Sequence, residues 1–135
     1  MGSRRKSREL TLQALYQAEV SGTEPLAQFA LFCDNFQVNQ KIVPLAQELL
    51  EGISAHATEI DALISQHTKN WRVGRMSVID RNLIRLGVYE VLFRDDVPAT
   101  VAINEAIEIA KRYSTDDAPS FINGILDAIN NGKSQ

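Results

Sequence analysis

The stretch Ser77–Arg94 constrains the fold of this chain most, because its apolar side chains point in nearly every direction. Over residues 83–93 only Arg85 and Glu90 are charged. A helix on a protein surface shows one apolar stripe and one polar face, so a helix with this sequence must be covered on most sides. The stretch is too short, and too charged at its ends, to span a bilayer.

Local signals at both ends indicate that this stretch is a helix. Ser77 can act as the N-cap, and Asp80 stands three residues later, close to a capping-box arrangement. Asp95 and Pro98 mark the end. Residues 88–93 alone would also suit a strand, but the full length of about four to five turns favours a helix. We interpret the stretch as the central helix of an all-α domain.

Apolar residues recur at helical spacing through most of the remaining chain, which predicts about six or seven helices in total. Residues 39–68 fit either one long helix or two collinear ones. Residues 70–76 form a connection, in which Trp71 is expected at the junction of an N-terminal and a C-terminal helical unit. The other predicted helices cover residues 4–20, 26–36 and 100–113, and a last segment that Asp117 or Ala118 caps and that continues through Ile129.

The charge of the chain is distributed unevenly. The net charge is −3, but residues 1–8 contain four basic side chains and no acidic one, a charge of +4. The remainder has ten basic and 17 acidic residues, a charge of −7. A basic arm on an acidic body is typical of a contact with a polyanion. A solvated, frayed terminus explains the same charges equally well. The four residues of this N-terminal arm are Arg4, Arg5, Lys6 and Arg8.

The sequence contains no constellation that would support catalysis. Phosphate-binding, dinucleotide-binding, nucleophile-elbow and zinc-helix motifs are all missing. Cys33 is the single cysteine, and His56 and His67 lack the spacing of metal ligands. We therefore predict a protein that is not an enzyme and has no metal site and no cofactor. The lone cysteine and the lack of a signal peptide predict a cytoplasmic protein that is not attached to a membrane.

Short motifs follow one another in a fixed order along nearly the whole chain. R-R-K-S-R-E at residues 4–9, Q-A-L-Y at 13–16 and E-L-L-E-G-I at 48–53 come first; I-D-R at 79–81, V-A-I-N-E-A-I-E-I-A-K at 101–111 and F-I-N-G-I-L-D at 121–127 follow. Each motif is weak alone, but in this order and at these spacings they are specific. Together they resemble the NusB transcription antitermination family.

The resemblance implies an all-α fold of two packed helical subdomains, residues 1–69 and 70–135, with about three helices each. It implies no catalysis. Members of the family pair with the ribosomal protein NusE, and the pair binds a short single-stranded RNA element, boxA, in ribosomal RNA leaders. The pair then supports a complex that keeps RNA polymerase transcribing through terminators. We expect these partners for the present chain.

The resemblance also implies which residues do the binding. The N-terminal arm is expected on RNA, and Asp80 and its neighbours Val73 and Met76 are expected where the partner protein docks. The alternative is that Asp80 only satisfies the helix N-terminus, with Val73 and Met76 in the core. Asp117 and Phe121 are expected near the RNA, with Tyr16 as a second aromatic candidate for stacking on a base. Phe121 and Tyr16 also fit apolar stripes, so core packing is the alternative for both. The chain departs from the family pattern at Ser120, where a basic residue is common, and at Ser114-Thr115, where an aromatic–Gly turn is commoner.

Two other functions are compatible with parts of this pattern. A NusB-like domain also forms the N-terminal part of some rRNA cytosine methyltransferases, so the chain could be such a domain in isolation. A purely structural helical adaptor that binds protein and no RNA is the second alternative. The N-terminal arm distinguishes this adaptor from an RNA-binding protein, because a protein-only adaptor does not need four clustered cations.

Overall fold

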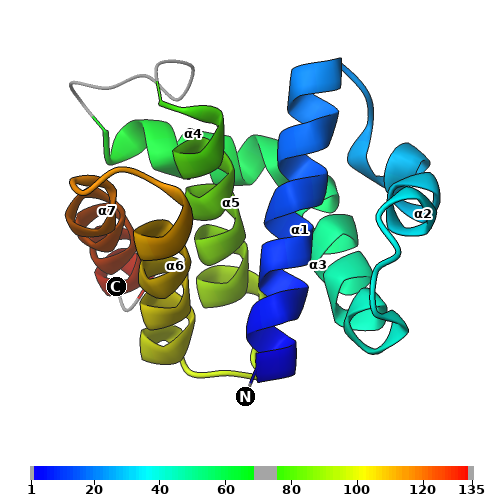
Figure 1. Ribbon diagram of the computed structural model, residues 1–135. Coiled ribbons are helices and arrows are strands. Elements are labelled where there is room, and N and C mark those ends of the chain that lie inside the picture. Colours follow the sequence, from blue (N-terminus) through cyan, green and yellow to red (C-terminus); the bar gives the residue numbers. More distant parts are fainter. Residues whose placement is uncertain (1, 69–75, 134–135) are drawn as a thin grey trace. The chain divides into compact units, whose positions relative to one another are not determined.

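The computed structural model describes residues 2–68 and 76–133, and within them the chain forms seven α-helices and one short 3₁₀-helix (Figure 1). No strand occurs in these two ranges. The all-α prediction is therefore confirmed. Among the described helices, none combines the length and the hydropathy that crossing a bilayer requires.

The chain divides into two compact units, Met1–Ala55 and His56–Gln135. The boundary predicted from the sequence, between residues 69 and 70, lies in the segment outside the described residues, as does Trp71. Residues 39–68 form two α-helices rather than one, because the backbone of His56 leaves the helical region at φ −113° and ψ 17°. The second of these helices belongs to the C-terminal unit.

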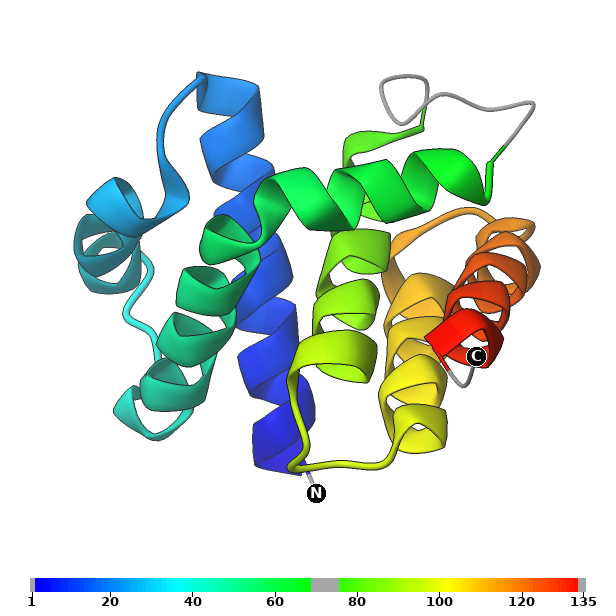
Figure 2. The ribbon, with the colours of Figure 1, turned by 180° about the vertical axis from the view of Figure 1, so that it is seen from behind.

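The first unit is built around α1 (Gly2–Ser21), which packs against α2 (Pro25–Asn35) and α3 (Val43–Ala55), as both views show (Figures 1 and 2). The hydroxyl of Ser7 donates a hydrogen bond of 2.9 Å to the carbonyl oxygen of Ile42, in the 3₁₀-helix η1 (Gln40–Ile42) that precedes α3. This bond ties the first turns of α1 to η1. The buried apolar side chains of the unit include Leu10, Leu12, Leu15, Phe29, Leu49, Leu50 and Ile53.

The second unit is built around α5 (Val78–Phe93), which contacts α4 (Ala57–Gln66), α6 (Ala99–Tyr113) and α7 (Ala118–Lys133). In Figure 2, α4 runs across α5, whereas α6 lies alongside it. The prediction that α5 is covered on most sides is confirmed, because its buried residues occupy all of its faces. They are Asn82, Leu83, Ile84, Leu86, Gly87, Val88, Tyr89, Glu90 and Val91.

The ends of α5 follow the signals in the sequence. Ser77 is the N-cap, and its hydroxyl accepts a hydrogen bond of 3.1 Å from the backbone N–H of Asp80. This is one half of a capping box. The helix ends at Phe93, and the ammonium group of Lys133 donates a hydrogen bond of 2.9 Å to the carbonyl oxygen of Val91. A cation at this end also compensates the negative end of the helix dipole.

Gly87 allows α5 and α7 to approach each other closely. A Cβ atom added to this residue would lie 2.7 Å from Cδ1 and 3.0 Å from Cδ2 of Leu126 on α7. The Leu126 side chain is completely buried, so it has little room to move away. Gly124, which is also inside a helix, has open space where its Cβ would stand.

We predict opposite effects for alanine at these two glycines. Gly87→Ala should destabilise the protein by about 1–3 kcal/mol, because the new methyl group overpacks the contact with Leu126. The matched control Gly124→Ala should stabilise it by about 0.5–1 kcal/mol through the lower backbone entropy of the unfolded chain. Urea denaturation followed by circular dichroism measures both changes. A Gly87→Ala protein as stable as Gly124→Ala would show that the contact between α5 and α7 adjusts freely.

Candidate functional site

A hollow of about 340 Å³ in the second unit lies where one helix ends and two others begin. One wall comes from the start of α5 and the residue before its cap, and the other from the loop between α6 and α7 and the first turn of α7. We call this hollow the C-terminal pocket. Its lining residues are Met76, Ser77, Asp80, Thr115, Asp117, Ala118 and Phe121.

The C-terminal pocket brings together residues that the sequence analysis assigned to two different ligands. Asp117 and Phe121 were expected near RNA, whereas Met76 and Asp80 were expected at the docking site of a protein. Met76 is only 7 % exposed, so it forms part of the wall rather than a protruding contact. Phe121 is half-buried, so its exposure is intermediate between that of a core residue and that of a fully exposed RNA contact. Val73 lies outside the described residues.

The lining of the pocket has the chemistry of a site for hydrogen-bond donors and cations. The residues that line it include two aspartates, Asp80 and Asp117, two residues with hydroxyl groups, Ser77 and Thr115, and the aromatic Phe121. Among the lining residues that the structure describes, none is basic. Carboxylates accept hydrogen bonds. The two aspartates can therefore accept hydrogen bonds from the amino group of a nucleobase or from a basic side chain.

One side-chain hydrogen bond joins the two walls of the pocket, and the sequence analysis did not predict it. The hydroxyl of Ser114 donates to Oδ1 of Asp80 at 2.6 Å. These residues are 34 positions apart in the chain. Ser114 attracted notice in the sequence only as a departure from the family pattern, which gives no indication of its hydrogen-bond partner.

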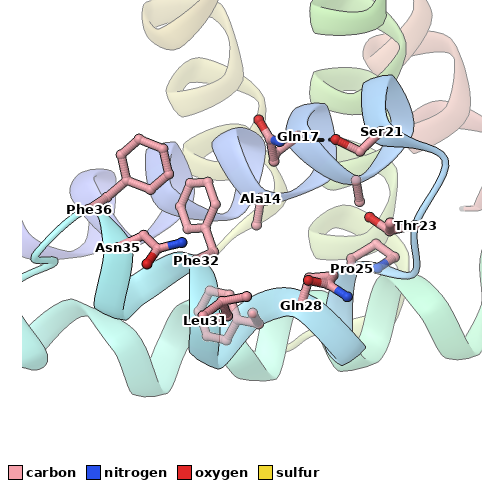
Figure 3. Close-up of a pocket in the computed structure, with 12 residues that line it drawn as sticks. Ala14, Gln17, Ser21, Thr23, Pro25, Gln28, Leu31, Phe32, Asn35 and Phe36 are labelled. Carbon is pink, nitrogen blue, oxygen red and sulfur yellow. Dashed lines mark hydrogen bonds between the residues drawn. The ribbon is translucent and has the colours of Figure 1, made fainter.

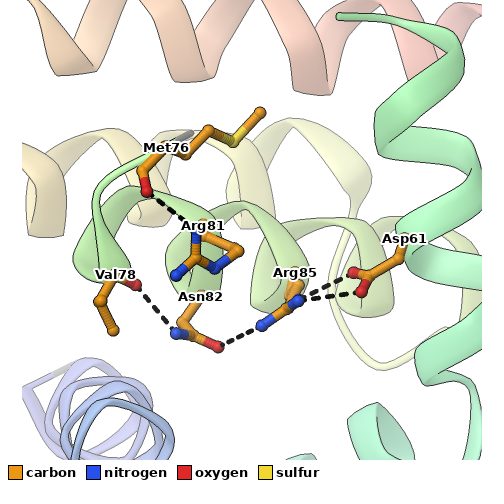
Figure 4. Close-up of polar contacts among 6 residues, drawn as sticks. All are labelled: Asp61, Met76, Val78, Arg81, Asn82 and Arg85. Carbon is orange, nitrogen blue, oxygen red and sulfur yellow. Dashed lines mark hydrogen bonds and ion pairs between the residues drawn. The ribbon is translucent and has the colours of Figure 1, made fainter. Parts of the chain in front are cut away.

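Polar side chains of α5 make a series of hydrogen bonds along its first turns (Figure 4). Arg85 forms a bidentate ion pair with Asp61 of α4, with distances of 2.8 Å from Nε to Oδ1 and 2.9 Å from Nη2 to Oδ2. Its Nη1 donates to Oδ1 of Asn82 at 3.1 Å. Arg81 donates through Nη1 to the carbonyl oxygen of Met76 at 2.8 Å, which holds one lining residue of the pocket directly.

The N-terminal arm forms the first turns of α1, where a helix dipole disfavours cations. Arg4 and Lys6 are exposed and Arg5 is half-buried, so these three side chains can reach a ligand. Arg8 is only 3 % exposed. Because Arg8 is buried, little of its guanidinium surface is accessible to a phosphate. The charge pattern of the sequence could not predict this burial. Tyr16, on the same helix, is 42 % exposed and is not a core residue.

A second hollow, of about 250 Å³, lies between α1 and α2 in the first unit (Figure 3). The sequence analysis singled out none of its residues. The rings of Phe32 and Phe36 contact each other in a tilted arrangement, with centroids 4.7 Å apart and an interplanar angle of 36°, and Phe36 is 65 % exposed. The side-chain amide of Gln17 donates to the hydroxyl of Ser21 at 3.0 Å. Among the lining residues in the described part of the chain, none is ionisable, so these residues offer no charged group to bind phosphate or a metal ion.

Residues that could hold a metal ion do not cluster within ranges 2–68 and 76–133. Cys33 is buried in the first unit. Burial, followed by the nearby carboxylate of Asp34, raises the pKa of its thiol. A thiol in this environment stays protonated at neutral pH and is a poor nucleophile and metal ligand.

Comparison with known proteins gives one consistent family. The sequence pattern of the NusB family matches residues 5–131. The transcription antitermination protein NusB of Desulfatibacillum aliphaticivorans is 47 % identical over 129 residues, which cover 96 % of this chain and 90 % of that protein. The solved structure of T. maritima NusB is 41 % identical, with a TM-score of 0.85 over 95 % of this chain and 90 % of that one. A structure of the antitermination factors NusB and NusE in complex with dsRNA is 26 % identical, with a TM-score of 0.86 over 98 % of both chains.

Proposed function

The chain belongs to the NusB family of transcription antitermination proteins, and from this premise we propose that it pairs with NusE and binds single-stranded boxA RNA. The observation that carries the proposal is the C-terminal pocket, which unites the residues expected to contact the partner with those expected near RNA. The family is non-catalytic, in agreement with the lack of catalytic motifs in the sequence. The proposal includes a role in ribosomal RNA transcription, in a complex with RNA polymerase in the cytoplasm.

We assign the phosphates and the bases of the RNA to different groups of residues. Phosphates are met by Arg4, Arg5 and Lys6 of the N-terminal arm, whose side chains are at least partly accessible. Arg8 is left out of this set because it is buried. Phosphate contacts carry affinity but no sequence preference. The sequence preference therefore needs a different kind of site.

The C-terminal pocket has the groups that reading a base requires. Stacking on an aromatic ring contributes about 1–3 kcal/mol per base, and Phe121 offers such a ring. The Asp117 carboxylate can accept hydrogen bonds from the amino groups of a base. Asp80, on the opposite wall, is assigned to NusE, so RNA and partner would meet at one pocket. Tyr16 offers a further exposed ring on α1 for either ligand.

Two alternatives are less well supported. An isolated methyltransferase domain is disfavoured because a relative matched over 90 % of its own length is named as an antitermination protein. A protein-only adaptor does not require the cluster of accessible cations at the start of α1. In the solved complex of NusB and NusE, which this chain resembles, RNA is also present.

The role of the N-terminal arm can be tested by reversing its accessible charges. Arg4→Glu with Lys6→Glu should weaken binding to any single-stranded RNA and reduce the salt dependence. Each phosphate contact contributes about −0.7 to the slope of log K against log salt concentration, so two lost contacts should flatten it by roughly 1.4. Fluorescence anisotropy across a salt series measures the slope.

The matched control reverses two exposed basic side chains of α6, Lys111→Glu with Arg112→Glu, which changes the net charge by the same amount. This control should keep most of the slope. If both double variants lose affinity equally, only the net charge of the protein matters, and the arm is a solvated terminus rather than an RNA site.

Phe121 should control the choice between RNA sequences. Phe121→Ala removes the stacking surface, so the variant should lose about 1–3 kcal/mol of binding to boxA RNA and much less with a scrambled RNA. Phe36→Ala, which removes an exposed ring from the first unit, is the control and should leave the difference between the two RNAs unchanged. Anisotropy titrations of the wild type and both variants with the two RNAs, in the presence of NusE, give the six affinities. A preserved preference in Phe121→Ala would show that Phe121 serves only packing.

Asp80 should control binding of the protein partner. Asp80→Lys reverses the charge on one wall of the pocket and should weaken NusE binding, while the melting temperature changes by only a few degrees. Asp127→Lys makes the same charge change at an exposed position on α7 that does not line the pocket. Isothermal titration calorimetry with purified NusE compares the two variants. Equal affinities for both would remove Asp80 from the interface.

A further inference from the structure

We propose that Ser114 is a positioning residue, which holds the Asp80 carboxylate in the orientation that binds the protein partner. The inference rests on the proposed function, in which Asp80 contacts NusE. Ser114 lies next to the C-terminal pocket, and the sequence analysis assigned it neither to the RNA-binding residues nor to the partner-binding residues.

The geometry of the bond between Ser114 and Asp80 is that of a strong hydrogen bond. The distance of 2.6 Å from Oγ to Oδ1 lies in the range typical of a hydroxyl that donates to an ionised carboxylate. The bond runs from the end of α6 to the first turn of α5. It therefore connects the element that carries Asp80 with the loop that carries Thr115 and Asp117, the opposite wall of the pocket.

Both partners of this bond are held by their own backbones. Ser114 is the C-cap of α6, and its N–H donates to the carbonyl oxygen of Ala110 at 2.8 Å. Asp80 is the third residue of α5, and its N–H donates to the hydroxyl of Ser77 at 3.1 Å. The donor and the acceptor are thus anchored at two helix ends. Because Ser114 cannot move along with the Asp80 side chain, the bond restricts the rotation of that side chain.

The bond also explains why the Asp80 side chain does not complete a capping box with Ser77. In a complete capping box, the acidic side chain three residues after the cap reaches back to the N–H of the cap residue. Here Oδ1 of Asp80 accepts from Ser114, at the end of α6, instead. Oδ2 remains as the oxygen that can accept a hydrogen bond from a partner side chain. An acceptor that is already oriented loses less conformational entropy when the partner binds.

The test is a thermodynamic cycle of NusE affinities measured by isothermal titration calorimetry on the full chain. The proteins are the wild type, Ser114→Ala, Asp80→Ala and the double variant. Ser114→Ala should weaken NusE binding by about 3- to 10-fold, as expected for one lost hydrogen bond. In the Asp80→Ala background the same substitution should have no further effect, because Ser114 acts through Asp80. Ser114→Thr, which keeps the hydroxyl, should restore affinity to near the wild-type value.

Ser120→Ala is the matched control, because it removes a hydroxyl from an exposed residue of α7 that does not line the pocket. It should bind NusE as tightly as the wild type. Thermal denaturation of every variant separates loss of binding from loss of folding. A purely structural role for Ser114 would lower the melting temperature and weaken binding equally in both Asp80 backgrounds, which would overturn the proposal.

The remaining outcomes are also decisive. If Asp80→Ala weakens NusE binding but Ser114→Ala does not, Asp80 orients itself without Ser114, and the positioning role is wrong while the proposed function stands. If Ser114→Thr fails to restore binding although it folds, the hydroxyl is not the active group. If the wild-type protein does not bind NusE at all, the proposed function fails and the positioning role falls with it.

Discussion

The burial of α5 on nearly all sides is the constraint on which the second unit depends. Leu83, Ile84 and Val88 are completely buried, and α4, α6 and α7 all contact this helix. The close approach of α7 at Gly87 shows how tightly that cover fits. The C-terminal pocket is a consequence of this packing, because its walls are the start of α5 and the loop between the two helices that pack beside it.

Burying a helix on all sides requires its polar groups to find partners, and those partners also shape the pocket. Asn82 is buried, and its amide nitrogen donates to the carbonyl oxygen of Val78 while its oxygen accepts from Arg85. Arg85 in turn pairs with Asp61 on α4. Within the described ranges, every buried side-chain nitrogen or oxygen has a hydrogen-bond partner. The first turns of α5 are consequently fixed, and with them the positions of Asp80 and Met76.

The proposed function depends on basic side chains at the start of α1 and acidic side chains in the C-terminal pocket. The accessible cations at the start of α1 attract any polyanion, whereas the two aspartates of the C-terminal pocket can accept hydrogen bonds from donor groups. Affinity and selectivity are therefore assigned to different residues. The hydrogen bond from Ser114 to Asp80 links the end of α6 to the helix whose start forms one wall of the pocket.

The sequence by itself determined most of the helices, because helical spacing and caps are local: the limits of α5 and the Ser77 cap follow from neighbouring residues. Whether residues 39–68 form one helix or two was decided only by the structure. The order of its motifs also identified the family. Only the tertiary structure decided which side chains are accessible and which lie together. Arg8 is buried although it lies in a basic cluster, and Tyr16 is exposed although it fits an apolar stripe. Asp80 and Phe121 line one pocket, and Ser114 bonds to a residue 34 positions away, because packing brings together side chains whose separation no local pattern encodes.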